Sequence, residues 1–195
     1  MHEEIQSLTE NETWITVSRS DVPSDKQVLS GKWVYKLKRN DDNVILRYKA
    51  RWVVKGFMQQ YGTDFDETFA SVVKPMAFRI LFALAAFLDL EVGQMDVKTA
   101  FLYGAIDKEI YVELPTGFED DGRSTVCKLQ KALYGLKQAP RLWFQTLTDF
   151  LLQKLGLEHL HSDHSIFATK EGLNGPIITS WVDDLKIITP NKTMA

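Results

Sequence analysis

Two apolar, β-branched runs flank a pair of adjacent aspartates in the stretch Ile177-Ile178-Thr179-Ser180-Trp181-Val182-Asp183-Asp184-Leu185-Lys186-Ile187-Ile188-Thr189. This composition predicts a tight β-hairpin with both carboxylates at its tip. An isolated Asp-Asp pair more often marks a solvated turn, because a short carboxylate bonds nearby backbone and tolerates unusual dihedral angles. Here the neighbouring residues are apolar, so we expect the pair to lie on a mostly buried sheet.

A third aspartate, Asp96, lies in a second apolar context, Val92-Gly93-Gln94-Met95-Asp96-Val97. Two unit charges about 4 Å apart interact by roughly 4 kcal/mol at an effective dielectric constant near 20, so three converging carboxylates would repel one another strongly. Divalent cations would neutralise such a cluster, and hard oxygen ligands suit Mg²⁺ or Mn²⁺.

The composition is that of a soluble globular chain with one sizeable core, or one domain with an attached lobe: 195 residues, 45% hydrophobic and 25% charged. Cys127 is the only cysteine, which excludes an internal disulfide and fits a reducing compartment. We expect it to be a strand residue in the core. The longest wholly apolar run, 80–88, is too short for a membrane span, and no signal peptide opens the chain, so no membrane partner is expected.

A basic segment lies between Lys26 and Lys55, where Lys and Arg alternate with Trp and Tyr. The net charge of −3 argues against a strongly basic nucleic-acid binder, but this local pattern could follow a phosphate backbone or hold a triphosphate. A solvated two-stranded ribbon with its charges facing water explains the pattern equally well.

Hydrophobic periodicity predicts an α+β fold in which helices pack on one face of an antiparallel sheet. The strand, helix, strand, strand order around Asp96 and the Asp-Asp tip resembles a split βαβ unit. The expected helices are 1–8, 75–90 (a core helix) and 140–155. The expected strands are 13–17, 32–39, 44–54, 92–97 (buried), 109–114, 126–133, 165–169, 177–182 and 185–189.

Several blocks of sequence, in one order along nearly the whole chain, carry a family resemblance. They are Lys32-Trp33-Val34-Tyr35-Lys36, Tyr48-Lys49-Ala50-Arg51-Trp52-Val53-Val54-Lys55-Gly56, Asp66-Glu67-Thr68-Phe69-Ala70, Gln94-Met95-Asp96-Val97-Lys98-Thr99-Ala100-Phe101-Leu102, Tyr111-Val112-Glu113, Ala132-Leu133-Tyr134-Gly135-Leu136-Lys137-Gln138-Ala139-Pro140-Arg141 and Val182-Asp183-Asp184. Together they resemble the copia-type (Pseudoviridae) retrotransposon reverse transcriptase.

The resemblance implies a reverse-transcriptase-like fingers region plus a ferredoxin-like palm, truncated before the thumb. Residues 1–195 would form a single domain fragment, with 1–72 and 104–138 fingers-like and 73–103 and 139–195 palm-like. The implied activity is that of an RNA-directed DNA polymerase within a polyprotein, and the isolated fragment is expected to be inactive without the thumb. The implied partners are an RNA or DNA template with primer, deoxynucleoside triphosphates and the rest of the polyprotein. The implied location is intracellular, in cytoplasmic virus-like particles or the nucleus.

By the same resemblance, catalysis involves Asp96, Asp183 and Asp184 with two Mg²⁺ ions, Mn²⁺ being an alternative. Asp96 and Asp183 would bridge the metals, and Asp184 would serve mainly the metal that activates the primer hydroxyl. The backbone carbonyl of Val97 would be a further metal ligand.

The implied nucleotide-binding residues are Lys38, Arg51, Phe101, Tyr134 and Gly135. Phe101 matches the family's aromatic steric gate, which leaves no room for a ribose 2′-hydroxyl; without the family, a plain core aromatic is the simpler interpretation. Arg51 and Lys38 match residues that clamp the β- and γ-phosphates, although Lys38 could be exchanged with Lys36.

Lys137 and Gln138 are expected on the template side, and Trp181 beside the primer end, where the family usually has Tyr. Lys186 also departs from the family, which has an apolar residue there. A lysine at an inward strand position is costly unless it pairs or reaches solvent, so Lys186 suggests a decaying copy.

Two alternative functions stay open. One is a truncated, inactive retroelement remnant with at most nucleic-acid binding through residues 26–55. The other, weaker one is a metal-dependent phosphohydrolase, which explains neither Phe101 nor the basic lobe.

Overall fold

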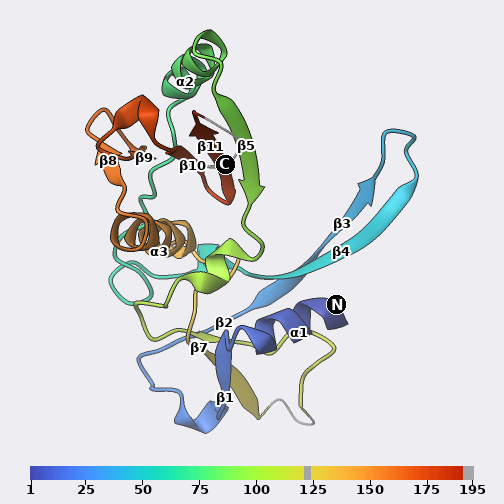
Figure 1. Cartoon of the computed structure of the whole chain (residues 1–195). Coiled ribbons are helices and arrows are strands. Elements are labelled where there is room, and N and C mark those ends of the chain that lie inside the picture. The colour runs from blue at the N-terminus through green and yellow to red at the C-terminus, as the bar shows by residue number, and fades with distance from the viewer. Residues whose placement is uncertain (121–123, 191–195) are drawn as a thin grey trace. The chain divides into compact units, whose positions relative to one another are not determined.

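The structure is a computed structural model that describes residues 1–120 and 124–190, and it divides the chain into two compact units (Figure 1). The first unit comprises Met1–Thr68 and Phe101–Trp143. The second comprises Phe69–Ala100 and the residues from Phe144 onward. Each unit has its own sheet and is described below by itself.

The first unit contains a four-stranded sheet with the order β1-β7-β6-β2. Its strands are β1 (Trp14–Ser18), β2 (Val28–Leu29), β6 (Tyr111–Val112) and β7 (Thr125–Leu129). The pairs β1–β7 and β6–β7 are antiparallel, whereas β2 and β6 are parallel. The helix α1 (His2–Glu10) precedes β1, with Glu3 and Glu4 in its first turn, where acidic side chains interact favourably with the helix dipole.

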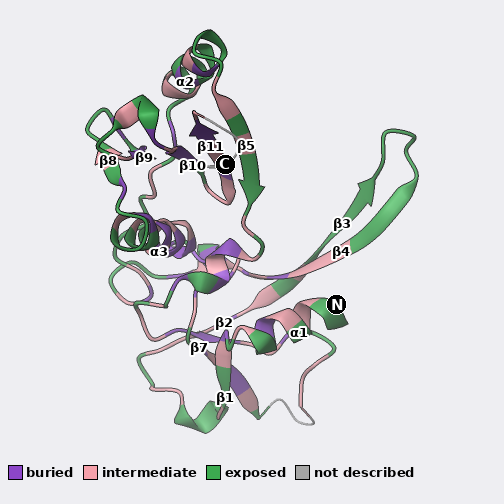
Figure 2. Ribbon diagram, viewed as in Figure 1, coloured by how far each residue is buried: buried purple, intermediate pink, exposed green. Residues whose placement is uncertain are grey.

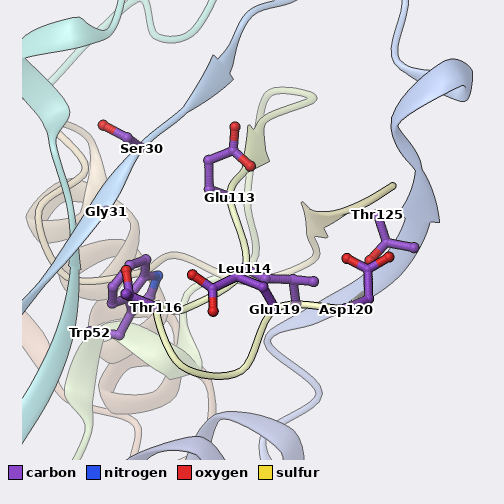
Figure 3. A pocket seen from close by; sticks show the side chains of 9 residues that line it. All are labelled: Ser30, Gly31, Trp52, Glu113, Leu114, Thr116, Glu119, Asp120 and Thr125. Atoms are coloured by element: carbon purple, nitrogen blue, oxygen red, sulfur yellow. The ribbon is translucent and has the colours of Figure 1, made fainter. Parts of the chain in front are cut away.

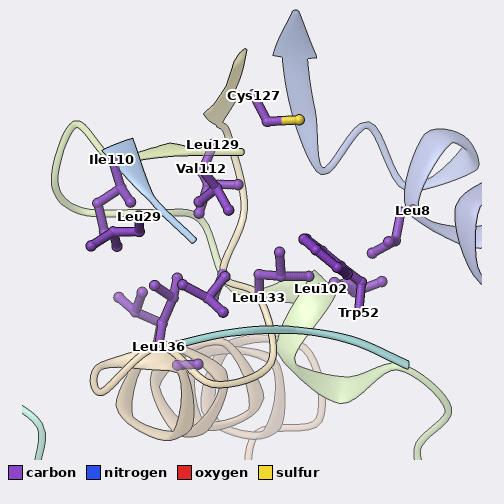
Figure 4. Packing of buried hydrophobic residues seen from close by; sticks show 14 residues of the cluster. Leu8, Leu29, Trp52, Leu102, Ile110, Val112, Cys127, Leu129, Leu133 and Leu136 are labelled. Atoms are coloured by element: carbon purple, nitrogen blue, oxygen red, sulfur yellow. The ribbon is translucent and has the colours of Figure 1, made fainter. Parts of the chain in front are cut away.

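The core of the first unit joins segments that are far apart in the sequence (Figure 4). Leu8 of α1, Leu29 of β2, Trp52, Leu102 and Leu133 all belong to one buried cluster. Cys127 lies in the same cluster, which confirms its predicted place in a core strand. Burial also raises the pKa of the Cys127 thiol to about 12, so this cysteine is a packing residue and a poor nucleophile at neutral pH.

A long two-stranded ribbon also belongs to the first unit and is formed by β3 (Gly31–Arg39) and β4 (Ile45–Val54). The two strands pair antiparallel over their whole length, with one register shift between Lys38 and Arg39. Most of the ribbon is exposed, whereas its base, which includes Trp52 and Val54, is buried (Figure 2). The predicted hairpin is therefore confirmed.

The second unit contains a five-stranded antiparallel sheet with the order β5-β11-β10-β9-β8. Its strands are β5 (Glu91–Asp96), β8 (Glu158–Leu160), β9 (Asp163–Ala168), β10 (Ile177–Trp181) and β11 (Asp184–Thr189). The β10–β11 pair is the predicted Asp-Asp hairpin. The strand β8 was not predicted from the sequence, and its register with β9 is irregular at His159/Leu160, which removes a regular alternation.

The helices of the second unit contact opposite faces of this sheet. Leu81 of α2 (Pro75–Phe87) shares a buried cluster with Ile177 and Ile188. Phe144 of α3 (Ala139–Gln153) contacts Phe167, which pairs with Ile178 and therefore points to the other face. The expectation that the helices pack on one face is wrong, because strand residues on both faces are apolar and each face has a helix partner.

The strand predicted at 92–97 and the helix predicted at 75–90 are both present, but the prediction that they are buried in the core is wrong. The strand β5 lies at the edge of the sheet, where Val92 is 44% exposed and Met95 51%. In α2 only Leu81 and Ala85 are buried. The element types are right, and α2 begins at Pro75, as proline at the first turn predicts.

Four 3₁₀ helices complete the described chain: Arg19–Asp21, Gly56–Met58, Ala100–Tyr103 and Gly172–Asn174. None of the helices in the described ranges has both the length and the apolar character that crossing a membrane requires. The mixture of helices and sheets confirms the α+β class.

Candidate active site

Three predicted site residues form a row across the face of the second unit's sheet. In the antiparallel register Trp181 of β10 stands opposite Asp184 of β11, and Asp184 stands opposite Asp96 of β5. Directly opposed residues of neighbouring strands point to the same face, with their Cβ atoms about 4.5–5.5 Å apart. Two aspartates 88 positions apart in the sequence are thus neighbours, and an indole lies beside them.

Asp183 occupies the two-residue turn between the strands, next to this row. Its carbonyl oxygen accepts a hydrogen bond from the backbone N–H of Val97, with an N···O distance of 2.9 Å. The residue before it, Val182, has a φ of +58°, as tight two-residue hairpin turns require at their first central position. A β-branched residue there is strained, which is a common feature of functional turns.

The next row on the same face contains Thr179, Lys186 and Gln94, again by strand register. The side-chain amide of Gln94 donates a hydrogen bond to Asp184 Oδ1 at 3.2 Å, which links the two rows. Lys186 is partly exposed, so it does not carry the full cost of an inward lysine. By strand register it lies on the same face of the sheet as Asp96 and Asp184.

The donor atoms of this site suit Mg²⁺ or Mn²⁺, since they are carboxylate oxygens at the edge of a sheet. Asp96 is exposed, and Asp183 and Asp184 are partly exposed, so cations can reach them. Among the described residues, no group of three or more Asp, Glu, His or Cys side chains is arranged to hold a metal ion. Mg²⁺ is commonly held by one or two carboxylates together with substrate phosphates, so the adjacent pair Asp96 and Asp184 fits such an ion.

The predicted nucleotide-binding residues lie in the first unit, and three of them are in contact. The guanidinium carbon of Arg51 lies 4.6 Å from the centre of the Tyr134 ring, and the rings of Tyr134 and Phe101 meet edge to face at 5.0 Å. Phe101 is partly buried and packs against the core cluster. The aromatic ring of Tyr134 thus joins the predicted phosphate-binding arginine to the predicted steric gate.

Gly135 lies where the 133–138 loop crosses the end of β4. Its φ is +94°, and a Cβ added there would lie 2.0 Å from the carbonyl oxygen of Val54. A Cβ on Gly56 would in turn lie 2.0 Å from the carbonyl oxygen of Gly135. The N–H of Val54 also donates to the carbonyl oxygen of Tyr134 at 2.8 Å, so the two segments touch through their backbones.

The ribbon formed by β3 and β4 has one basic face and one aromatic face. The pairs Lys36–Lys49 and Lys38–Arg47 alternate with Tyr35–Ala50 and Leu37–Tyr48. Partial burial, and after it repulsion from Arg51, Lys38 and Arg47, lowers the pKa of Lys49, as expected for clustered cations.

Lys38 and Arg51 are not neighbours on this face. Lys38 pairs with Arg47, four residues along β4 from Arg51, which corresponds to roughly 13 Å along a strand. Lys36 pairs with Lys49 and is therefore the nearer lysine.

The two residues predicted on the template side differ in exposure. Lys137 is exposed, and its ammonium lies 4.6 Å from the centre of the Phe65 ring. Gln138 is completely buried and bonded to Gln59 and to the backbone of Asp64. Neither Gln59 nor Asp64 was predicted as a site residue, because isolated polar residues in a loop carry no periodic signal.

A cavity of about 230 Å³ also lies in the first unit, but none of the predicted site residues lines it (Figure 3). Its lining residues are Ser30, Gly31, Trp52, Glu113, Leu114, Thr116, Glu119, Asp120 and Thr125. Glu113 is paired with Arg19, Glu119 accepts a hydrogen bond from the N–H of Gly117, and Asp120 accepts hydrogen bonds from Ser124, so all three of its carboxylates have partners within the chain.

Comparison with known proteins identifies the family. The family described as reverse transcriptase (RNA-dependent DNA polymerase) matches residues 11–195. The chain is also 47% identical, over 98% of its length, to the Retrovirus-related Pol polyprotein from transposon TNT 1-94 of Nicotiana tabacum. The chain belongs to the copia-type reverse transcriptase family. The resemblance inferred from the sequence blocks is therefore confirmed.

Other relatives of this reverse transcriptase segment are also transposon polyproteins. It is 38% identical over its whole length to the Retrovirus-related Pol polyprotein from transposon RE1 of Arabidopsis thaliana, and 27% identical over 97% of its length to the Transposon Ty1-DR4 Gag-Pol polyprotein of Saccharomyces cerevisiae. The chain spans only 14%, 13% and 11% of the lengths of the tobacco, Arabidopsis and yeast proteins.

Proposed function

We propose that this chain supplies the catalytic aspartates and part of the nucleotide site of an RNA-directed DNA polymerase that works within a longer Pol polyprotein. The observation that supports this most directly is the register of the second unit's sheet, which sets Asp96 opposite Asp184 beside Asp183. The reaction is transfer of a nucleotide to a primer 3′-hydroxyl, directed by an RNA or DNA template.

In this proposal Asp96, Asp183 and Asp184 hold two Mg²⁺ ions, with the Val97 carbonyl as a further ligand and Mn²⁺ as an alternative metal. The bound ions would stabilise the attacking and leaving oxygens of an in-line displacement. Trp181 offers an aromatic face to the primer end from the position opposite Asp184.

The remaining proposed roles belong to residues of the first unit. Arg51 binds the triphosphate, together with Lys38 or Lys36, and its contact with Tyr134 restricts the guanidinium. Tyr134 and Gly135 lie near the base and template, and Lys137 lies on the template side. Phe101 excludes a ribose 2′-hydroxyl by occupying its space.

The proposed architecture is a fingers-like region at 1–72 and 104–138 and a ferredoxin-like palm at 73–103 and 139–195. The division into two compact units, with changes of unit after Thr68, Ala100 and Trp143, supports it. By family, the polyprotein would act in cytoplasmic virus-like particles or the nucleus.

The decisive experiment is primer extension by the polyprotein segment that contains this chain, carrying Asp183→Asn. We expect synthesis to fall by more than about 100-fold, because one metal-binding charge is lost. The control is Asp89→Asn, an equal change at an exposed turn of the same unit. Undiminished extension by Asp183→Asn would refute the role of Asp183.

The second candidate function is nucleic-acid binding without polymerase activity, and the same primer-extension assay distinguishes it from the first. The basic face of the ribbon favours nucleic-acid binding, whose affinity should fall as salt rises. If the unsubstituted protein binds primer–template in this way but never extends it, the chain is an inactive remnant with nucleic-acid binding only.

A second prediction concerns Phe101. Phe101→Val should admit ribonucleotides, because removal of the ring opens space for a 2′-hydroxyl. The measurement is the ratio of kcat/KM for a deoxynucleotide to that for the matching ribonucleotide. The control is Phe57→Val, since Phe57 is 81% exposed in the same unit. An unchanged ratio in Phe101→Val would remove the steric-gate role.

A further inference from the structure

Three hydrogen bonds form a buried relay between two loops of the first unit. The N–H of Lys137 donates to Gln59 Oε1 at 2.7 Å, Gln59 Nε2 donates to Gln138 Oε1 at 3.0 Å, and Gln138 Nε2 donates to the carbonyl oxygen of Asp64 at 2.8 Å. Gln138 is 0% exposed and Gln59 is 5% exposed. Each amide therefore uses both its oxygen and its nitrogen within the protein.

The far end of this relay is held by further bonds. The carboxylate of Asp64 accepts from the N–H of Gln60 at 2.8 Å and from Gln27 Nε2 at 2.7 Å. Gln27 also donates to the carbonyl oxygen of Met58 at 2.8 Å. The loop that carries Gln59 and Asp64 is thus fixed from both sides, and it provides a firm support for Gln138.

The near end of the relay leads to the proposed nucleotide site. Lys137 and Gln138 follow Tyr134-Gly135 after the single residue Leu136. The backbone of Tyr134-Gly135 touches β4, and the tyrosine ring contacts both Arg51 and Phe101. The relay attaches this segment at its C-terminal side, and the bond from Val54 to Tyr134 attaches it at its N-terminal side. Two attachments fix the position of a short loop better than one.

We infer that Gln138 and Gln59 are positioning residues for the nucleotide site, and that Gln138 does not contact the template. Their paired amides hold the 134–137 segment so that the Tyr134 ring keeps Arg51 and Phe101 in place. The inference rests on the proposed function for its kinetic consequence, whereas its structural part stands on the chain alone.

The structural part is tested on the 195-residue chain by amide hydrogen exchange at Lys137 and Val54. Gln59→Met should speed exchange at Lys137 by about tenfold or more, because it removes the acceptor of the Lys137 N–H. Gln138→Met should have an effect of the same size, because it removes the partner that holds the Gln59 amide in place. The double variant, Gln59→Met with Gln138→Met, replaces both amides by apolar side chains of similar size. It should keep the fold, while the amide of Lys137 still exchanges faster than in the unsubstituted chain. Gln130→Met is the matched control, since Gln130 is exposed and its side-chain amide donates to the adjacent carbonyl oxygen of Leu129, outside the two loops of the relay. Unchanged exchange in all three variants would overturn the inference and leave the polymerase proposal untouched.

The kinetic part uses the polymerase-active polyprotein segment. Both single variants should raise KM for the deoxynucleotide by roughly 5–10-fold and weaken discrimination against ribonucleotides, with kcat and primer–template Kd within about twofold. A merely structural defect would lower the active fraction and therefore kcat, without changing KM or discrimination. If Gln138→Met weakens template binding while Gln59→Met has no effect, Gln138 is a template contact and the inference is wrong. If the unsubstituted protein does not polymerise at all, the proposed function fails, and the exchange experiment still decides the relay.

Discussion

At the scale of single residues, the turn residue Val182 shows how the site differs from an ordinary hairpin. Tight hairpin turns favour glycine or asparagine where φ is positive, yet a β-branched valine stands there with a φ of +58°. Such strain costs roughly 1–3 kcal/mol and persists only where the surroundings impose it. Here the bond from Val97 to the carbonyl oxygen of Asp183 and the pairing of both strands impose it.

We predict that Val182→Gly raises the free energy of unfolding by about 1 kcal/mol, because relief of strain exceeds the entropy that glycine loses on folding. The same change should lower primer extension, because Asp183 would be held less firmly. Chemical denaturation and the extension assay measure the two effects. Asn43→Gly is the control, since Asn43 has a φ of +64° but asparagine tolerates it. A loss of stability in Val182→Gly would contradict this account.

At the scale of elements, the crossing of β4 and the 133–138 loop depends on two glycines that admit no side chain. The Cβ of any other residue at position 135 would overlap the backbone carbonyl of Val54. That carbonyl cannot move away without breaking the hydrogen bond from the N–H of Val54 to the carbonyl oxygen of Tyr134. The predicted nucleotide residues Tyr134 and Arg51 are held together by this crossing.

Gly135→Ala should therefore destabilise the chain by about 3 kcal/mol or more, the sum of an unfavourable φ and a steric clash. Gly62→Ala is a matched control, because Gly62 has a φ of +84° but nothing within 4 Å of an added Cβ, so only about 1 kcal/mol is expected there. Thermal or denaturant unfolding measures both. Equal losses in the two variants would show that the close approach at residue 135 contributes little.

Elements with a clear period were predictable from the sequence, and those without one were not. The amphipathic pattern of α3 and the β-rich runs of β10 and β11 identified both kinds of element, and Asp96 was rightly placed at the end of a strand. Burial was harder to predict, because β5 carries the apolar residues Val92 and Met95 but lies at a sheet edge. The relay of Gln59 and Gln138 could not be predicted, since it depends on a long-range meeting of two irregular loops.

At the scale of the whole molecule, α2 presents a mainly apolar surface. Its 13 residues include only one charged side chain, Arg79, and a helix apolar on all sides is normally buried. Five of its residues and those adjoining it are large, apolar and more than a third exposed: Met76, Ile80, Phe82, Phe87 and Leu88. Exposed apolar side chains gathered on one helix favour association.

We predict that the 195-residue chain self-associates as its concentration rises, and that Ile80→Lys with Phe87→Lys reduces this, because charge opposes burial of the patch. Sedimentation velocity over a concentration series measures the effect. Phe150→Lys is the control, since Phe150 is 52% exposed but lies on α3. A monomer at every concentration would contradict the prediction.

The pairing of Asp96 with Asp184 has a consequence for judging sibling copies of this gene. Successive strand residues alternate between faces, so gain or loss of one codon within β5 would turn the first acidic group to the opposite side of the sheet. Such a copy would retain an unbroken reading frame and all three aspartates, yet its polymerase would be inactive. The number of residues in that strand is therefore as informative about a copy's polymerase activity as the presence of its three aspartates.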